Sequence, residues 1–282
     1  MINKFPGTCG ACRGPVPAGA GQVVNEAGRW QAYHNDCVPV RVAPPVGTHG
    51  GWHDGPLVAF DLEATLAEPL DARIISAALV HSDGSVRTWL VNPGVPIPPD
   101  ATAINGFTDE VVRRDGAPAA AAIADIGTAI AKYIADGIPL VAFRASYDVT
   151  VLHTELTRHG LPAINWDQAV IIDPFILHKQ VEPDWSGRRT LSVLADYYQV
   201  RLDKAHDAVS DARATLDLAR AIAARHERIA RMPVAALHEA QIRWYAEDSR
   251  SLQKYYDRRG IDNTVNGEWP LETGRRGQPS AL

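Results

Sequence analysis

The sequence predicts a mixed α/β protein, preceded by a small metal-binding module and followed by a helical extension. Three observations support this fold class. Short apolar segments such as "LVAFDLEATL" and "AVIIDPF" are typical of buried strands, and they alternate with longer segments of helical character. All 3 cysteines fall within the first 37 residues. The last long segment, "VAALHEAQIRWYAEDSRSLQKYYDRR", places its apolar residues at partly helical spacing.

Length and composition narrow the class of protein. With 282 residues, of which 46% are hydrophobic, the chain can bury one large core and carry one or two small additions. Its apolar runs are too short to span a bilayer, and its first residues lack the pattern of a signal peptide, so we expect a cytoplasmic protein with no membrane partner. The net charge of -5 gives no overall attraction to nucleic acid, which would need a local basic patch or bound metal ions.

Residues 1–48 predict a zinc-binding module. The spacing C-x2-C, a gap, then H-x2-C is typical of a structural Cys3His site. The residues between the two pairs predict a β-hairpin that turns at Gly28. Because so short a segment has too little core to fold alone, a metal would supply folding free energy. The expected ligands of one structural Zn2+ are Cys9, Cys12, His34 and Cys37.

The same cysteines have an alternative interpretation. They could form a flexible tail with a free redox C-x-x-C pair, although no thioredoxin-like βαβ pattern surrounds them. Beyond them, residues 42–56 are rich in Pro and Gly, and we expect residues 49–56 to be a linker between the module and the next domain.

Residues 57–231 form the expected α/β domain. It begins with three strands in an antiparallel meander, the second and third joined by a tight turn at Asp83-Gly84. Gly137 and Gly160 stand at the usual C-cap position of two helices. The later elements are expected as helix 118–136, strand 138–143, helix 147–160, strand 169–175, helix 190–198 and helix 207–230.

Residues 232–282 form the expected C-terminal extension, a helix over 233–259 and a flexible tail. The helix would pack its apolar positions against the α/β core or against a replication or repair partner.

Two acids lie inside the first strand of the α/β domain. Side chains alternate along a strand, so Asp61 and Glu63 point to the same face, where they repel each other unless a cation holds them. Asp148 and Asp211 lie at the starts of two helices, the second of them five residues after His206. Taken singly, a helix-start acid is a favourable partner of the helix dipole. Together the four carboxylates are the hard oxygen ligands that Mg2+ or Mn2+ requires.

The segments "FDLEAT", "ASYD" and "HDAVSD" resemble the three motifs of the DnaQ-like (DEDD) 3'-5' exonucleases, in the order found in that family. The resemblance covers about residues 56–224, and the histidine five residues before the last Asp is typical of the DEDDh branch. It implies a ribonuclease H-like mixed sheet flanked by helices and hydrolysis at nucleic-acid 3' ends. It also implies two Mg2+ or Mn2+ ions held by Asp61, Glu63, Asp148 and Asp211, with His206 as general base.

The resemblance also implies a set of substrate-binding residues, several of which depart from the family pattern. Arg144 stands where Asn is usual, Tyr147 where Phe is usual, Ala64 where Thr is common, and Asn105 where His is frequent. Arg144 could bind a phosphate bidentately, or it could be a surface residue without a role. The full expected set is Leu62, Ala64, Thr65, Asn105, Phe107, Arg144 and Tyr147.

Three functions fit these observations: a metal-dependent exonuclease, a catalytically weak nucleic-acid-binding or interaction module on the same fold, and a zinc-containing scaffold. The presence of all four acids and His206 favours the exonuclease, since binding alone does not require all five. The expected partner is a single-stranded 3' end. DNA and RNA remain equal alternatives, because both present the same phosphodiester.

Overall fold

The central sheet gathers six strands in the order β10-β9-β5-β6-β7-β8. The computed structural model describes residues 1–26, 29–39, 41–185 and 187–274. Strands β5, β6 and β7 pair antiparallel, which confirms the predicted meander, whereas β9 and β10 run parallel to β5, and β8 runs parallel to β7. The strands are β5 (Val58–Ala64), β6 (Ile74–His81), β7 (Val86–Asn92), β8 (Ala117–Pro118), β9 (Leu140–Val141) and β10 (Ile171–Ile172).

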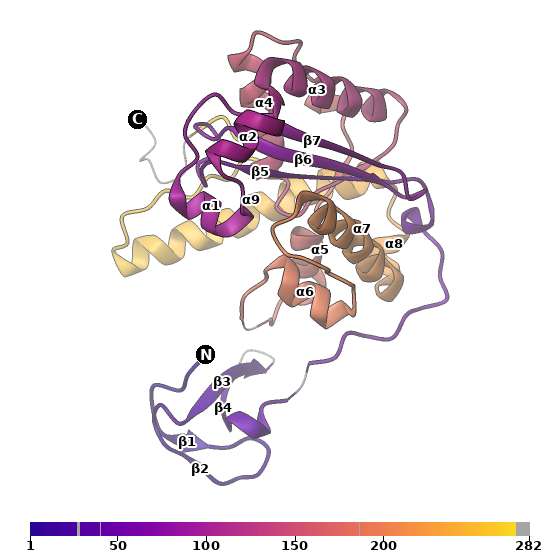
Figure 1. Ribbon diagram of the computed structural model, residues 1–282. Helices are drawn as coiled ribbons and strands as arrows, with labels where there is room; N and C mark the ends of the chain where they lie inside the picture. Colours follow the sequence, from indigo (N-terminus) through magenta and orange to yellow (C-terminus); the bar gives the residue numbers. More distant parts are fainter. Residues whose placement is uncertain (27–28, 40, 186, 275–282) are drawn as a thin grey trace.

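Helices cover both faces of this sheet (Figure 1). The helices are α3 (Ala119–Ala135), α4 (Ser146–Arg158), α5 (Pro174–Val181), α6 (Leu191–Tyr198) and α7 (Ala208–Arg225). Phe60 and Leu62 of β5 pack toward α3 and α4, while Ala59 and the preceding Leu57 pack toward α7. Because side chains on both faces of the sheet pack against helices, the domain has three layers, with a hydrophobic core on each side of the sheet.

Three details differ from the sequence prediction. The predicted helix 207–230 is divided at His226 into α7 and the short α8 (Glu227–Ala230). The loop after β7 contains two helices that the sequence did not indicate, α1 (Pro99–Asn105) and α2 (Asp109–Asp115). The strands predicted over 138–143 and 169–175 pair over only two residues each, at β9 and β10.

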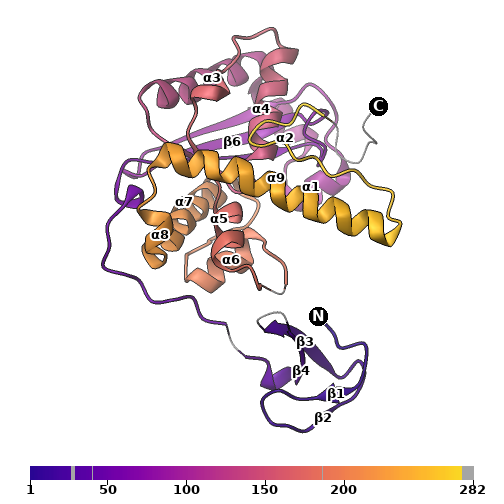
Figure 2. The ribbon, with the colours of Figure 1, turned by 180° about the vertical axis from the view of Figure 1, so that it is seen from behind.

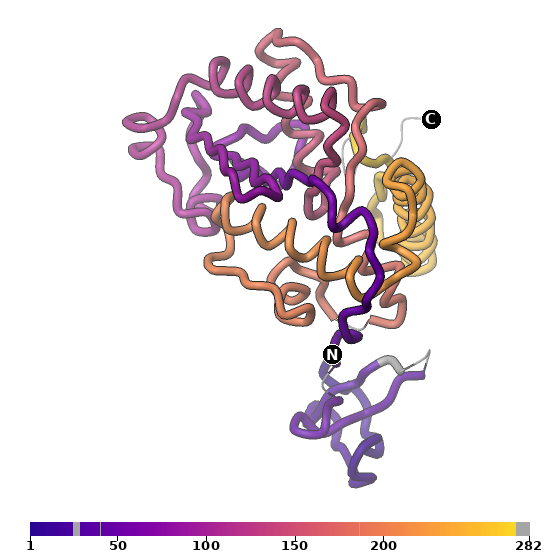
Figure 3. The backbone as a smooth tube through the Cα atoms, turned by 90° about the vertical axis from the view of Figure 1, so that its right-hand side faces the viewer, coloured from indigo at the N-terminus to yellow at the C-terminus, as the bar shows by residue number. Residues whose placement is uncertain are grey.

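The N-terminal module consists of two small β-hairpins and one turn of 3-10 helix, and Figure 3 shows it set apart from the α/β domain. Its hydrophobic cluster is small and includes Cys9, Val16, Val24 and Tyr33. The predicted turn at Gly28 lies outside the described residues. The elements are β1 (Gly7–Thr8), β2 (Pro15–Val16), β3 (Gly21–Glu26), β4 (Arg29–His34) and η1 (Asn35–Cys37).

The segment expected as a linker is attached to the α/β domain over residues 47–54. Gly47 N donates to Ala224 O at 2.8 Å, and Trp52 Nε1 donates to Ile229 O at 2.9 Å. Gly51 lies so close to α8 that a Cβ there would meet Ala230 O at 2.2 Å. We call residues 47–54 the docked segment; it includes the 3-10 turn η2 (Trp52–Asp54).

The C-terminal helix α9 (Val234–Arg259) runs beside α5 and β10, and Figure 2 shows it crossing the back of the molecule. The chain then folds back, so that Trp269 is buried beside His238 with ring centroids 5.1 Å apart. Glu272 N donates to Thr150 Oγ1 on α4 at 2.9 Å. The extension is therefore part of the domain's core. Residues 275–282, most of the expected flexible tail, lie outside the described residues.

None of the described helices combines the length and apolar character needed to cross a membrane.

Candidate functional site

Strand β5 carries the first two acids of the site. Asp61 and Glu63 alternate with Phe60 and Leu62, so they point toward the α7 side of the sheet, as the strand pattern predicts. Asp61 is paired regularly with Ala78 of β6, whereas the register of β5 and β6 shifts between Glu63 and Ala64. Such irregularities are often found beside active sites, and Glu63 therefore lies where β5 leaves regular pairing.

The third acid, Asp148, lies in the first turn of α4 and is 4% exposed. Its Oδ1 accepts a hydrogen bond from Leu62 N at 3.2 Å, which fixes α4 against β5 between the two strand acids. The loop before α4 is held in turn by Asp173, whose carboxylate oxygens accept from Arg144 N and Ala145 N, both at 3.0 Å.

The fourth acid, Asp211, lies in the first turn of α7. Its Oδ2 accepts from the backbone NH of His206 at 2.9 Å, and His206 adopts a positive φ of 62°. This contact places the exposed His206 beside the acids. Ligand atoms of Glu63, His206 and Asp211 all lie within 4.8 Å of one another. Asp211 Oδ1 is buried and has no hydrogen-bond partner among the described residues.

The electrostatics of the four carboxylates favour a bound cation. Burial, reinforced by neighbouring acids, raises the pKa of Asp61 well above its usual value and raises that of Glu63 to about 7. Burial also raises the pKa values of Asp148 and Asp211, although hydrogen bonds from backbone NH groups oppose this. Within the described ranges, no Lys or Arg forms a salt bridge with any of the four.

These observations fit a divalent metal centre. The donor set is made of carboxylate oxygens, the acids repel one another, and Asp211 Oδ1 is a buried acceptor without a partner. Mg2+ and Mn2+ prefer such oxygen ligands.

All five predicted catalytic residues line one cavity of about 580 Å³, a volume typical of ligand sites. Six of the seven predicted substrate residues line it as well: Leu62, Ala64, Thr65, Asn105, Arg144 and Tyr147. Phe107 does not belong to this lining. It packs instead on the hydrophobic cluster of Ile75, Ile97 and Val112, and its backbone NH donates to Asn105 Oδ1 at 3.0 Å.

The polar substrate residues differ in what they can offer a ligand. Thr65 Oγ1 accepts from Arg73 N at 3.0 Å, and the Tyr147 hydroxyl donates to Leu66 O at 2.5 Å, so both are used within the chain. Asn105 Nδ2 is buried and has no partner among the described residues. The exposed Arg144 stacks its guanidinium over the Phe175 ring, with 4.6 Å between Cζ and the ring centroid.

Sequence reasoning missed several lining residues, among them Asp173, Phe175 and Tyr245. Asp173 precedes a proline at the end of a strand, a position that could have drawn attention to it. Tyr245 comes from α9, and a helical pattern alone does not show which side chain of a distant helix reaches a cavity.

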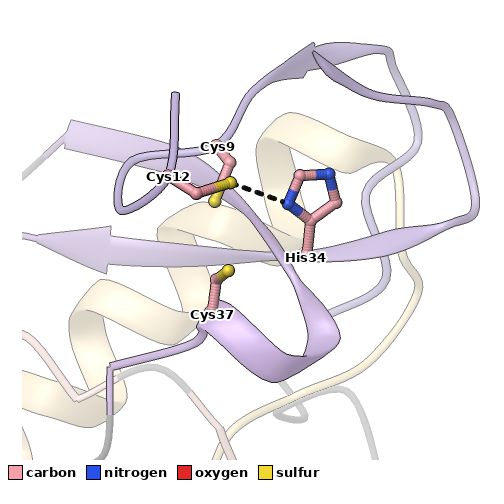
Figure 4. Close-up of side chains that lie close together, drawn as sticks. All are labelled: Cys9, Cys12, His34 and Cys37. Atoms are coloured by element: carbon pink, nitrogen blue, oxygen red, sulfur yellow. Dashed lines mark hydrogen bonds between the residues drawn. The ribbon is translucent and has the colours of Figure 1, made fainter. Parts of the chain in front are cut away.

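The four residues predicted to bind zinc converge in the N-terminal module (Figure 4). Their ligand atoms lie within 4.8 Å of one another, and Cys12 Sγ is 3.2 Å from His34 Nδ1. His34 Nε2 lies 2.9 Å from Pro15 O, and a proton on Nε2 donated to this carbonyl leaves Nδ1 free to bind a metal. Three thiols and one imidazole suit tetrahedral Zn2+.

Comparison with protein families identifies the α/β domain. Residues 58–219 match the model of the RNase_T family, which is described as exonuclease. The chain belongs to this exonuclease family. The match includes all four acids and His206, and it confirms the resemblance to DnaQ-like exonucleases.

Relatives of the exonuclease domain include larger proteins. The DNA polymerase III PolC-type protein of Streptococcus sanguinis is 29% identical over 166 residues, which cover 57% of this chain and 11% of that protein. The structure of E. coli exonuclease I in complex with a dT13 oligonucleotide has a TM-score of 0.53 and 19% identity, covering 62% of this chain and 42% of that one. The zinc-bound E. coli exonuclease I–single-stranded DNA complex has a TM-score of 0.53 and 20% identity over the same shares. These likenesses confirm the mixed sheet with flanking helices.

Proposed function

We propose that this protein is a 3'-5' exonuclease that hydrolyses phosphodiester bonds with two divalent cations, Mg2+ or Mn2+. One observation carries the proposal: four repelling carboxylates and His206 line a single cavity, with no Lys or Arg paired to the acids in the described part of the chain. Family membership supports nuclease chemistry, and the order of the three motifs supports 3' polarity and the DEDDh subtype.

The four carboxylates are proposed to share one task, the binding of the divalent cations. Asp61 and Glu63 on β5, Asp148 on α4 and Asp211 on α7 supply the oxygen ligands from three separate elements. Divalent cations held there lower the pKa of an attacking water and stabilise charge on the phosphate and the leaving 3' oxygen. The hydrogen bond from Leu62 N to Asp148 holds the α4 and β5 ligands at a fixed separation.

His206 is proposed to accept the proton of the attacking water. Its side chain is exposed at the cavity, and its ring nitrogen lies within 4.8 Å of carboxylate oxygens of Glu63 and Asp211. The hydrogen bond between His206 N and Asp211 holds the backbone near the acids while leaving the imidazole free to move toward water.

The proposed substrate is the 3' end of a single strand. The E. coli exonuclease I structure named above contains a single-stranded oligonucleotide, and the cavity here is an open pocket lined by apolar and polar side chains. Leu62, Ala64, Thr65 and Asn105 are proposed to contact the terminal nucleotide, with Arg144 and Tyr147 on the facing wall. DNA and RNA are to be compared directly.

The N-terminal cluster is proposed to hold one structural Zn2+. Four protein ligands fill a tetrahedral shell and leave no position for a reacting water. A replication or repair partner for the C-terminal helix, and a cytoplasmic location, remain predictions from the sequence.

The test uses matched DNA and RNA oligonucleotides labelled at the 5' end. Metal-replete protein should shorten them one nucleotide at a time from the 3' end, EDTA should stop the reaction, and Mg2+ or Mn2+ should restore it. Protein that binds the oligonucleotides without shortening any of them would instead identify a binding module, and the proposal would be wrong.

A further inference from the structure

The C-terminal helix α9 contributes a side chain to the nuclease cavity. Tyr245 lines the cavity together with the acids, and it is partly buried against the main core. The segment matched to the exonuclease family ends at residue 219, whereas α9 begins at Val234. This part of the cavity wall therefore comes from the extension rather than from the family domain.

Tyr245 of α9 lines the cavity together with Phe175 of α5 and Arg144, and we call these three side chains the α9 wall. Lys179 Nζ forms a salt bridge of 2.5 Å with Asp248, which lies three residues after Tyr245 and thus on the same side of α9. Lys179 Nζ also lies 5.6 Å from the Phe175 ring centroid, and the guanidinium of Arg144 stacks on the same ring. The lining thus includes two aromatic rings, Phe175 and Tyr245, and the cation Arg144, whereas Lys179 supports the Phe175 ring without lining the cavity itself.

This wall is held firmly. Gln241, one turn before Tyr245, is fully buried, accepts from Asp173 N at 2.7 Å and donates to Ile171 O at 2.9 Å. His238 Nδ1 accepts from Ile171 N at 3.1 Å. Because α9 is bonded to Ile171 and Asp173 at these points, the part of α9 that carries Tyr245 is fixed against the sheet.

The chemistry of the wall suits a nucleotide. Aromatic rings stack on bases regardless of base identity, and an exposed guanidinium binds a phosphate. The other side of the cavity, formed by β5 and α1, is already proposed for the terminal nucleotide. The wall of Arg144, Phe175 and Tyr245 remains for the strand on the 5' side of the scissile phosphate.

We propose that Tyr245 stacks on the nucleotide preceding the terminal one and that Arg144 binds its phosphate, which makes the C-terminal extension a substrate-binding element. This inference rests on the proposed nuclease function and names how the strand is held. It also gives α9 a role that requires no partner protein.

The test compares two substrates that differ in the 5' part of the strand. A dT10 oligonucleotide reaches the α9 wall, whereas the methyl ester of thymidine 5'-phosphate presents only the terminal nucleotide and an alkoxide leaving group without an aromatic ring. Tyr245→Ala should lower kcat/KM for dT10 relative to the ester by roughly 5- to 150-fold, the range expected for one lost base–aromatic stack. Tyr245→Phe should keep the wild-type ratio.

Two further variants guard against misinterpretation. Tyr245→Leu fills the space against the core but lacks an aromatic face, so it should lower the ratio like the alanine variant if folding is not the cause. Tyr255→Ala alters a tyrosine of the same helix that is 43% exposed and does not line the cavity. This variant should keep the wild-type kcat/KM for both substrates.

Each outcome bears on one proposal. The assignment of Tyr245 would be wrong if both Tyr245→Ala and Tyr245→Leu kept the wild-type ratio of kcat/KM for dT10 to kcat/KM for the ester. If the wild type hydrolyses neither substrate, the proposed nuclease function is wrong. The affinity of the protein for dT10 then tests the assignment of Tyr245 on its own. In an Asp211→Asn background that prevents hydrolysis, fluorescence anisotropy should show weaker dT10 binding with Tyr245→Leu added, and equal binding would refute it.

Discussion

The backbone NH of Asp173 donates a 2.7 Å hydrogen bond to Oε1 of Gln241 on α9. Asp173 in turn accepts from Arg144 N and Ala145 N, directly before the helix that carries Asp148. Two consecutive sets of hydrogen bonds thus connect the C-terminal helix with a proposed metal ligand.

Gln241→Ala should weaken both folding and hydrolysis. The change leaves Asp173 N and Ile171 O buried without their partners, which should lower the free energy of unfolding by about 1–3 kcal/mol. Hydrolysis should fall as well, because the start of α4 loses part of its support. Urea unfolding and oligonucleotide hydrolysis measure the two effects. Arg243→Ala, at an exposed position two residues away, is the control and should change stability by less than about 0.5 kcal/mol.

Without divalent metal, Glu63 should make a contribution to stability that falls as pH rises from about 4 to 7. The pKa of Glu63 is raised to about 7 by burial and by Asp211, so the folded state keeps a proton that the unfolded state has lost in this window. Each such group lowers stability by up to about 1.4 kcal/mol per pH unit. Thermal unfolding in EDTA should show that Glu63→Gln gains stability relative to the wild type as pH rises through this window, and added Mg2+ should reduce the difference. Parallel pH profiles of the two proteins in EDTA would contradict the described crowding of acids.

His206→Asn should slow turnover by roughly 10²- to 10⁴-fold, the usual contribution of a general base. Metal binding should persist, because the carboxylates are unchanged, and the pH–rate profile should differ from that of the wild type. His159→Asn, at the C-terminal end of α4, is the matched control. Wild-type turnover with an unchanged profile in His206→Asn would show that another group accepts the proton.

Purified protein should contain one zinc ion per chain, and Cys37→Ser should lower this content because it removes one of four ligands. Oligonucleotide hydrolysis should continue in the variant, since the cluster lies in the N-terminal module and not at the acid cavity. Elemental analysis and the nuclease assay together test this. Zinc-free wild-type protein, prepared without chelator, would refute the assignment.

The docked segment should matter more for stability than the module before it. Removal of residues 1–40 keeps the contacts of Gly47 and Trp52, so the unfolding of the α/β domain should change little. Removal of residues 1–54 should lower its stability by about 2 kcal/mol or more, because the Trp52 side chain no longer covers the end of α7. Equal midpoints of denaturation for the two truncations would contradict this.

The sequence was most informative where the local pattern dictates the structure. Alternation along β5 placed Asp61 and Glu63 on the same face, the Asp83-Gly84 turn joined β6 to β7, and the cysteine spacing located the ligand cluster. Each of these features depends on neighbours within a few residues. The mixed sheet itself is confirmed, while the roles of the site residues stay predictions.

Features that depend on distant contacts could not be predicted in this way. The docked segment is held by backbone carbonyl groups of α7 and α8 that lie far along the chain. Trp52, for example, donates to the carbonyl of Ile229, 177 residues later. Phe107 was assigned to the substrate site by motif resemblance, and the sequence did not show that it packs on the apolar cluster of Ile75 and Ile97. The contribution of Tyr245 depends on the path of α9, which Gln241 and His238 determine through β10.

Strand β10 forms one outer edge of the central sheet, and open edges of this kind are sites at which strands of other molecules add on and proteins aggregate. Here the outward NH and CO of Ile171 are occupied by the side chains of His238 and Gln241. A fragment ending at residue 219, where the family match ends, would expose this edge and would aggregate by strand pairing between copies. The last long helix thereby keeps the sheet from growing beyond a single molecule.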